Sequence, residues 1–312
     1  MRRRYLCGAI VAVLATAAAL SAASSRAAVH SSMKPATKSV LRVFKGKPGQ
    51  PARPRRTNNL SYQGGVGGIG VETAPKVYLV LWGSQWTGND PSGESNLLQN
   101  FFTAVGGSPW VNSVTQYCQG VAPGTTNCPA GSAFAGGSVA FAAAQVWADN
   151  GSAAPAHPTQ TQLATEAINA ANHFGNTTAA GNKTVQYVIA TSKGNSSSGF
   201  GTQYCAWHSS TSSTYGNIAY TNLPYMTDAG ASCGANFNNL GPFAGITIVE
   251  GHEMAETITD QFPNGGWLDG SGEENGDKCA WNSTTSSQPM GGSSFPVQPL
   301  WSNASGSCVL SY

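Results

Sequence analysis

The sequence predicts a single α+β domain stabilised by disulfide bonds. Short apolar runs rich in β-branched and aromatic residues alternate with amphipathic runs at helical spacing, a pattern typical of mixed sheets and helices. The gaps between the runs are of hairpin length, which favours α+β over a doubly wound sheet. Six cysteines follow an N-terminal export signal, and an even number in an exported chain favours disulfide bonds over free thiols.

The N-terminus predicts export. Arg2, Arg3 and Arg4 precede an apolar run over 5–20, and small residues suited to a signal peptidase follow. We therefore assign residues 1–27 to a signal peptide. The apolar run is shorter than the roughly 20 residues that span a bilayer, and no later stretch is apolar enough to do so. The sequence predicts a secreted, extracellular protein with no membrane attachment after cleavage.

Charge is divided sharply along the chain. Residues 29–60 carry eight lysines and arginines and no carboxylate, with several prolines, so residues 28–58 are predicted to be a basic, disordered leader or propeptide. From Ser61 onward there are four lysines, no arginine and all 14 carboxylates. We expect no nucleic-acid partner, because a body of that charge repels phosphate. Residues 59–312 fit one globular domain, expected to be a monomer.

The elements of this domain are predicted from hydrophobic spacing. The helix at 243–260 is expected to end before Pro263 and the two glycines that follow it. The predicted elements are strands at 76–82, 137–141, 184–191 and 218–223, and helices at 95–105, 161–174 and 243–260.

The cysteines admit many pairings, and the sequence does not choose among them. We predict the sequential set, because each bridge closes a short loop rich in Gly, Ser and Asn. These bridges are Cys118–Cys128, Cys205–Cys233 and Cys279–Cys308. The last is expected to hold an acidic loop in place.

Carboxylates gather in one segment. Eight of the 14 lie within residues 250–277, accompanied only by Lys278. Such a cluster repels itself unless something positive sits in it, and a bound metal ion is the usual answer. His252 and Glu256 are four residues apart, so a helix places both on one face as metal ligands, with Glu253 beside them as a general base.

The motif is HExxE, whereas zinc peptidases carry HExxH. A carboxylate can bind zinc, although replacing an imidazole lowers the charge of the site and weakens its preference for zinc. The alternative interpretation is a solvated helix whose acidic face happens to include a histidine, because short motifs recur by accident.

The sequence downstream offers a third ligand. Glu274 as ligand with Asp277 orienting His252 fits a zincin-like active-site helix, and Asp277 as a direct ligand is the alternative. Zn²⁺ is the predicted cofactor. Ca²⁺ is the alternative, because Asp269, Ser271 and Glu273 alternate as in oxygen-rich calcium loops.

His208 lies close to Cys205 and is a candidate catalytic residue, as a transition-state donor, or a further metal ligand. The alternative is a structural histidine under a loop. His157 and His173 have no acidic or cysteine neighbours in the sequence and receive no role.

Several segments, taken in order, resemble the phosphate-induced protein 1 family, the EXORDIUM-like proteins. They are Ser61–Gly65, Val77–Gly83, Tyr204–Cys205 with His208, His252–Glu256 with Thr259–Asp260, Trp267, and Glu274 with Asp277 and Cys279. An additional residue between Asp260 and Trp267 and the lack of a proline after Asp260 depart from the family pattern. The resemblance implies an extracellular protein, and it makes the pairing of HExxE with ExxD a feature of the family.

Two classes of function follow. One is a secreted metal-dependent hydrolase, a zinc metallopeptidase in which Glu253 deprotonates the attacking water, acting on a polypeptide or cell-wall substrate. The other is a non-catalytic extracellular or cell-wall-associated protein, in which a metal or a carboxylate network only fixes loops.

Overall fold

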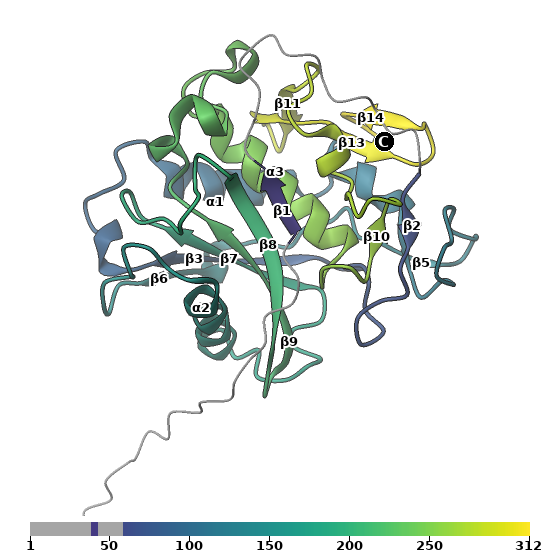
Figure 1. The fold of residues 1–312 in the computed structure, drawn as a ribbon, viewed down its shortest axis with the longest axis horizontal. Helices are drawn as coiled ribbons and strands as arrows, with labels where there is room; N and C mark the ends of the chain where they lie inside the picture. The colour runs from purple at the N-terminus through teal and green to yellow at the C-terminus, as the bar shows by residue number, and fades with distance from the viewer. Residues whose placement is uncertain (1–38, 43–58) are drawn as a thin grey trace, which may run out of the picture. The chain divides into compact units, whose positions relative to one another are not determined.

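The computed structural model describes residues 39–42 and 59–312 (Figure 1). It confirms the prediction of mixed helices and sheets with three disulfide bonds. The predicted signal peptide, 1–27, and most of the predicted leader, 28–58, lie outside the described residues. Four residues of that leader, Ser39–Arg42, form strand β1.

The core of the fold is a six-stranded sheet in the order β1-β8-β9-β7-β3-β6. Strands β6, β3, β7 and β9 run parallel to one another, whereas β8 is antiparallel to both β9 and β1. Their bounds are β3 Lys76–Trp82, β6 Val146–Asp149, β7 Val185–Thr191, β8 Tyr204–Ser213 and β9 Gly216–Leu223.

Helices cover both faces of this sheet (Figure 1). Helix α2 (Gln160–His173) packs on one face and begins with a capping box between Thr159 and Gln162. Helices α1 (Glu94–Val105) and α3 (Ala244–Thr259) pack on the other. Strand β3 supplies both cores, because alternate side chains point to opposite faces: Leu79 packs on the side of α3, and Val80 on the side of α2.

One of the predicted strands is wrong, and the longest strand of the sheet was not predicted. The strand predicted at 137–141 is absent; Ala140 forms only an isolated bridge with Lys76, and β6 lies at Val146–Asp149 instead. Strand β8 was missed, because its second half is rich in Ser and Thr rather than apolar residues. Ser209 and Thr211 are nevertheless buried, between neighbouring elements rather than facing water. The remaining predicted strands and all three helices are confirmed within one or two residues.

The parallel centre of the sheet also differs from the expected hairpin connections. The chain between β3 and β6 includes α1, and the chain between β6 and β7 includes α2, and connections of that kind join parallel strands.

Small two-stranded sheets complete the fold. Strand β12 lies against α3, where the Thr247 hydroxyl donates to the carbonyl oxygen of Pro296 at 2.6 Å. The pairs are β2 (Ser61–Tyr62) with β10 (Trp267–Leu268), β4 (Cys118–Gln119) with β5 (Ala133–Phe134), β11 (Ser286–Met290) with β12 (Ser293–Val297), and β13 (Leu300–Ser302) with β14 (Ser307–Val309). The 3-10 helices are η1 Ser84–Trp86, η2 Val111–Gln116, η3 Ala143–Gln145, η4 Met226–Asp228, η5 Gly230–Cys233, η6 Phe237–Asn239 and η7 Asp277–Cys279.

The three disulfide bonds join Cys118 to Cys128, Cys205 to Cys233 and Cys279 to Cys308, as predicted. The second links the start of β8 to the loop that precedes α3. No helix within the described ranges is long and apolar enough to cross a membrane.

Candidate metal site

Helix α3 carries the HExxE motif through the interior of the protein. Every residue from Ala244 to Thr259 is buried, so the interpretation of a solvated acidic helix is wrong. His252, Glu253 and Glu256 are all fully buried. A buried charge is costly unless it is paired, hydrogen-bonded or bound to a metal, and the surroundings of these side chains therefore decide what the helix can do.

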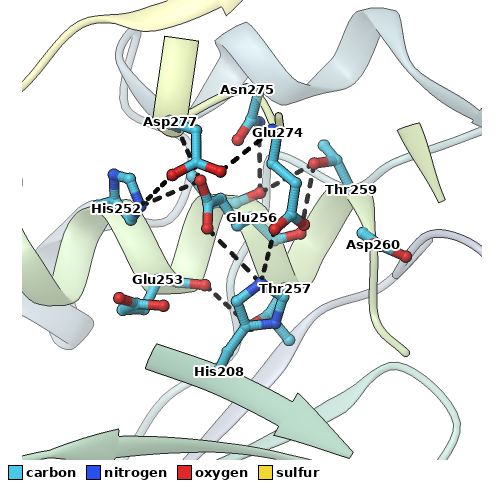
Figure 2. Close-up of polar contacts among 12 residues, drawn as sticks. His208, His252, Glu253, Glu256, Thr257, Thr259, Asp260, Glu274, Asn275 and Asp277 are labelled. Atoms are coloured by element: carbon cyan, nitrogen blue, oxygen red, sulfur yellow. Dashed lines mark hydrogen bonds and ion pairs between the residues drawn. The ribbon is translucent and has the colours of Figure 1, made fainter. Parts of the chain in front are cut away.

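The first group of converging atoms surrounds His252. Its Nε2 atom lies 3.0 Å from Glu256 Oε1 and 3.8 Å from Asp277 Oδ1 (Figure 2). The short contact with Glu256 does not have the geometry of a hydrogen bond, and Nε2 has no hydrogen-bond partner among the described residues. A ring nitrogen and a carboxylate oxygen that lie this close without an aligned hydrogen bond suit two ligands of one cation.

The second group surrounds His208, which β8 directs from the sheet towards α3. Its Nε2 atom lies 3.1 Å from Glu274 Oε2 and 3.5 Å from Glu256 Oε2. Figure 2 shows the Glu256 carboxylate between the two histidines. The structure therefore places Asp277 beside His252, and Glu274 beside His208.

Two further glutamates of α3 are buried without partners. Neither carboxylate oxygen of Glu253 or of Glu250 accepts a hydrogen bond from any residue in the described ranges. Burial raises the pKa of Glu253 to about 8, although the nearby His252 ring partly offsets this rise. Burial likewise raises the pKa of Glu250, and Glu253 adds to that effect. These carboxyls lack the direct hydrogen-bonded partner that a buried anion requires, at least among the residues that the structure describes.

The histidines and Glu256 shift one another's pKa values. Burial alone would lower the pKa of His252, but the neighbouring Glu256 carboxylate raises it to about 9. Burial would raise the pKa of Glu256, and yet the two histidines lower it to about 2. Without a metal, Glu256 is therefore an anion that attracts protons to both rings. A divalent cation would take the place of those protons.

The loop that carries Glu274 and Asp277 is held in place by three hydrogen bonds, two of them to helix α3. The Asp277 N–H donates to Glu256 Oε1 at 2.8 Å, and the Asn275 side-chain amide donates to the carbonyl oxygen of Ala255 at 3.3 Å. The Gln298 side chain donates to the carbonyl oxygen of Gly276 at 2.8 Å. Two residues after Asp277, Cys279 is joined to Cys308 by a disulfide bond.

Opening the Cys279–Cys308 bridge is expected to weaken metal binding. Replacing both cysteines with serine should lower the free energy of unfolding by about 3 kcal/mol on the chain-entropy account, and should also lower zinc affinity, because the bridge holds the loop of Asp277. Urea unfolding and a zinc titration measure the two effects. The Cys118→Ser, Cys128→Ser protein is the control; an equal loss of zinc affinity in both proteins would contradict the local role of the bridge.

Gly276 is a position that sequence reasoning missed. A Cβ atom there would lie 2.8 Å from His252 Nδ1 and 2.9 Å from Glu256 Oε1. A glycine between two candidate ligands was the available signal, since close backbone approach is a common reason for glycine. The anchors Asn275 and Gln298 gave no such signal.

The contacts of Asp269 do not favour the predicted calcium loop. Asp269 Oδ1 accepts backbone N–H groups from Ser271 at 2.7 Å and Glu273 at 3.1 Å, and its Oδ2 pairs with Lys278 at 2.9 Å. Both oxygens of this carboxylate are thus occupied by the protein. His157 and His173 also lie outside the site: His157 contacts the carbonyl oxygen of Ser196, and His173 stacks on Trp147.

Within the described residues, two sets of side chains could hold a metal ion. The first is His252, Glu256 and Asp277, and the second is His208, Glu253 and Glu256; in each, the ligand atoms lie within 4.8 Å of one another. Imidazole nitrogen and carboxylate oxygen suit Zn²⁺ and other divalent transition metals. The unpartnered buried atoms and the donor chemistry both fit such a cation.

Comparison of the chain with family models, with curated proteins and with solved structures finds no match. The resemblance to the phosphate-induced protein 1 family therefore stays a prediction.

Proposed function

We propose that this protein is a secreted metal-dependent hydrolase, most closely comparable to a zinc metallopeptidase. The observation that carries the proposal is the convergence of His252 Nε2, Glu256 Oε1 and Asp277 Oδ1 without hydrogen-bond geometry between the first two. A catalytic zinc site uses three protein ligands and leaves a position for water.

In this proposal α3 acts as a zincin-like helix. His252 and Glu256 hold the cation from one face of the helix, and Asp277 takes the place of the third ligand. Glu274 is assigned to His208 rather than to the cation, because the two are 3.1 Å apart. A divalent cation supplies Lewis-acid activation of a water molecule and of the carbonyl group under attack.

Glu253 is the proposed general base. Its carboxylate has no hydrogen-bond partner in the described part of the chain, and burial raises its pKa to about 8. A base poised near neutral pH accepts a proton from water and returns it to the leaving group. His208, oriented by Glu274, donates a hydrogen bond to the developing oxyanion. The side chain of Asp277 is 23% exposed, which gives water a path to this side of the site.

The substrate class proposed is a polypeptide or a cell-wall polymer. The proposal of secretion rests on the N-terminal signal pattern and agrees with three disulfide bonds, which form in oxidising compartments.

One observation favours the second candidate, a non-catalytic protein in which the metal only fixes loops. Except for Asp277, the six candidate residues are almost fully buried. A closed, buried site is typical of structural metal sites. Glu253 argues against this non-catalytic candidate. A buried carboxylate without a hydrogen-bond partner among the described residues, beside the first ligand, does not stabilise a structural metal site.

Hydrolysis of casein and of peptide libraries separates the two candidates. The hydrolase is expected to lose activity with a chelator and to regain it with zinc. Glu253→Gln should lower kcat by about 100-fold or more, the usual contribution of a general base, while the protein keeps its first cation. If wild-type protein stays inactive with every metal supplied and every substrate offered, the hydrolase proposal fails and the structural alternative holds.

A further inference from the structure

Glu256 faces two different histidines with its two oxygens. Oε1 lies 3.0 Å from His252 Nε2, and Oε2 lies 3.5 Å from His208 Nε2 (Figure 2). One carboxylate can hold two cations in this manner, and cations bridged in two-metal sites lie about 3.5 to 4 Å apart. The first cation position uses Oε1 and leaves Oε2 near His208, with no hydrogen bond from any described residue.

The atoms around Glu256 Oε2 form a second ligand set. One ligand atom each from His208, Glu253 and Glu256 lies within 4.8 Å of the others, and all three side chains are fully buried. Within 39–42 and 59–312, Glu256 Oε2 and both oxygens of Glu253 have no hydrogen-bond partner. This set needs neither His252 nor Asp277, so it is a separate position and not another description of the first.

The charges of the carboxylates around Glu256 also favour a second cation. Glu253, Glu256, Glu274 and Asp277 bring four carboxylates together, and Lys278, the only lysine or arginine in the segment 250–279, pairs with Asp269 instead. One divalent cation balances the charges of Glu256 and Asp277. Glu274 is paired with His208. The Glu253 carboxylate then remains in a buried region, where an unbalanced anion is costly, and a second divalent cation balances it.

We infer that the site contains a second cation position, formed by His208, Glu253 and Glu256, which shares Glu256 with the catalytic position. The inference rests on the proposed function and adds a mode of regulation to it. When the second position is filled, Glu253 is a ligand and cannot accept a proton from water. Zinc in excess therefore inhibits the enzyme that the first zinc ion activates.

Zinc titration of metal-free protein tests the inference, with stoichiometry read by calorimetry and by native mass spectrometry. Wild-type protein is expected to bind two ions per chain. Glu253→Gln and His208→Gln should each weaken the second ion by at least ten-fold and keep the first. Glu250→Gln is the matched control: it removes a buried, unpartnered carboxylate from the same helix and lies outside both ligand sets, so it should bind two ions.

The outcomes separate the two proposals. One ion in wild-type protein overturns the second position and leaves the hydrolase standing, whereas no ion overturns both. Two ions that persist with unchanged affinity in Glu253→Gln and in His208→Gln also overturn the assignment. Because the two variants change different elements, α3 and β8, misfolding of one leaves the other as the test. In wild-type protein, hydrolysis should peak near one equivalent of zinc and fall as the second binds.

Discussion

Replacing Glu256 with glutamine is expected to abolish tight zinc binding at both positions. Its two oxygens approach His252 and His208 separately, so it is the only residue common to the two ligand sets. An amide offers one neutral oxygen in place of two that share a negative charge. Loss of an outer partner of a ligand already costs about 10- to 100-fold in metal affinity, and loss of a shared ligand should cost more than 100-fold.

Equilibrium dialysis against buffered zinc measures this effect directly. Glu250→Gln again serves as the control, because it makes the same chemical change in the same buried helix six residues earlier. Zinc binding by Glu256→Gln that matches the control would show that the ion sits elsewhere.

Replacing Gly276 with alanine is expected to damage the site without straining the backbone. Gly276 has φ −76° and ψ −47°, which alanine adopts readily. The added methyl group, however, would lie within 3.0 Å of both His252 Nδ1 and Glu256 Oε1, so at least one ligand must move. We expect zinc affinity to fall by about ten-fold or more, and the overpacking to cost about 1 to 3 kcal/mol of stability.

Gly270→Ala is the matched control for that variant. Gly270 belongs to the same acidic segment, and a Cβ atom there meets nothing within 4 Å. Zinc affinity and urea unfolding of the two variants should therefore differ clearly. Equal zinc affinity in Gly276→Ala and Gly270→Ala would mean that the loop does not approach the ligands as closely as the structure has it.

Features of the fold that depend on local pattern were predictable. The apolar runs of β3 and β7 and the helical spacing of α1, α2 and α3 each depend on a short stretch of sequence. The disulfide pairing that short loops favoured, although the sequence did not choose it, is the one observed. Strand β8 was not predictable in this way, because the burial of Ser209 and Thr211 depends on the elements packed around it and not on their own hydrophobicity.

In the site, too, some features follow from local sequence spacing and others depend on the fold. Helical spacing alone put His252 and Glu256 on one face of α3, and the structure has them in contact. The sequence left open whether Glu274 or Asp277 joins them. That choice depends on how the loop docks, through the Asp277 N–H on Glu256 and the Asn275 amide on Ala255. The partnership of His208 with Glu274 joins residues 66 apart and needed the fold.

Anomalous X-ray diffraction at the zinc absorption edge tests the central claim most directly, on crystals of the wild-type protein grown with zinc. The account predicts an anomalous peak bonded to His252 Nε2, Glu256 and Asp277, and no such peak in crystals of Glu256→Gln grown in the same way. Zinc found only on the surface, with His252 and Glu256 left in contact and no ion between them, would contradict it.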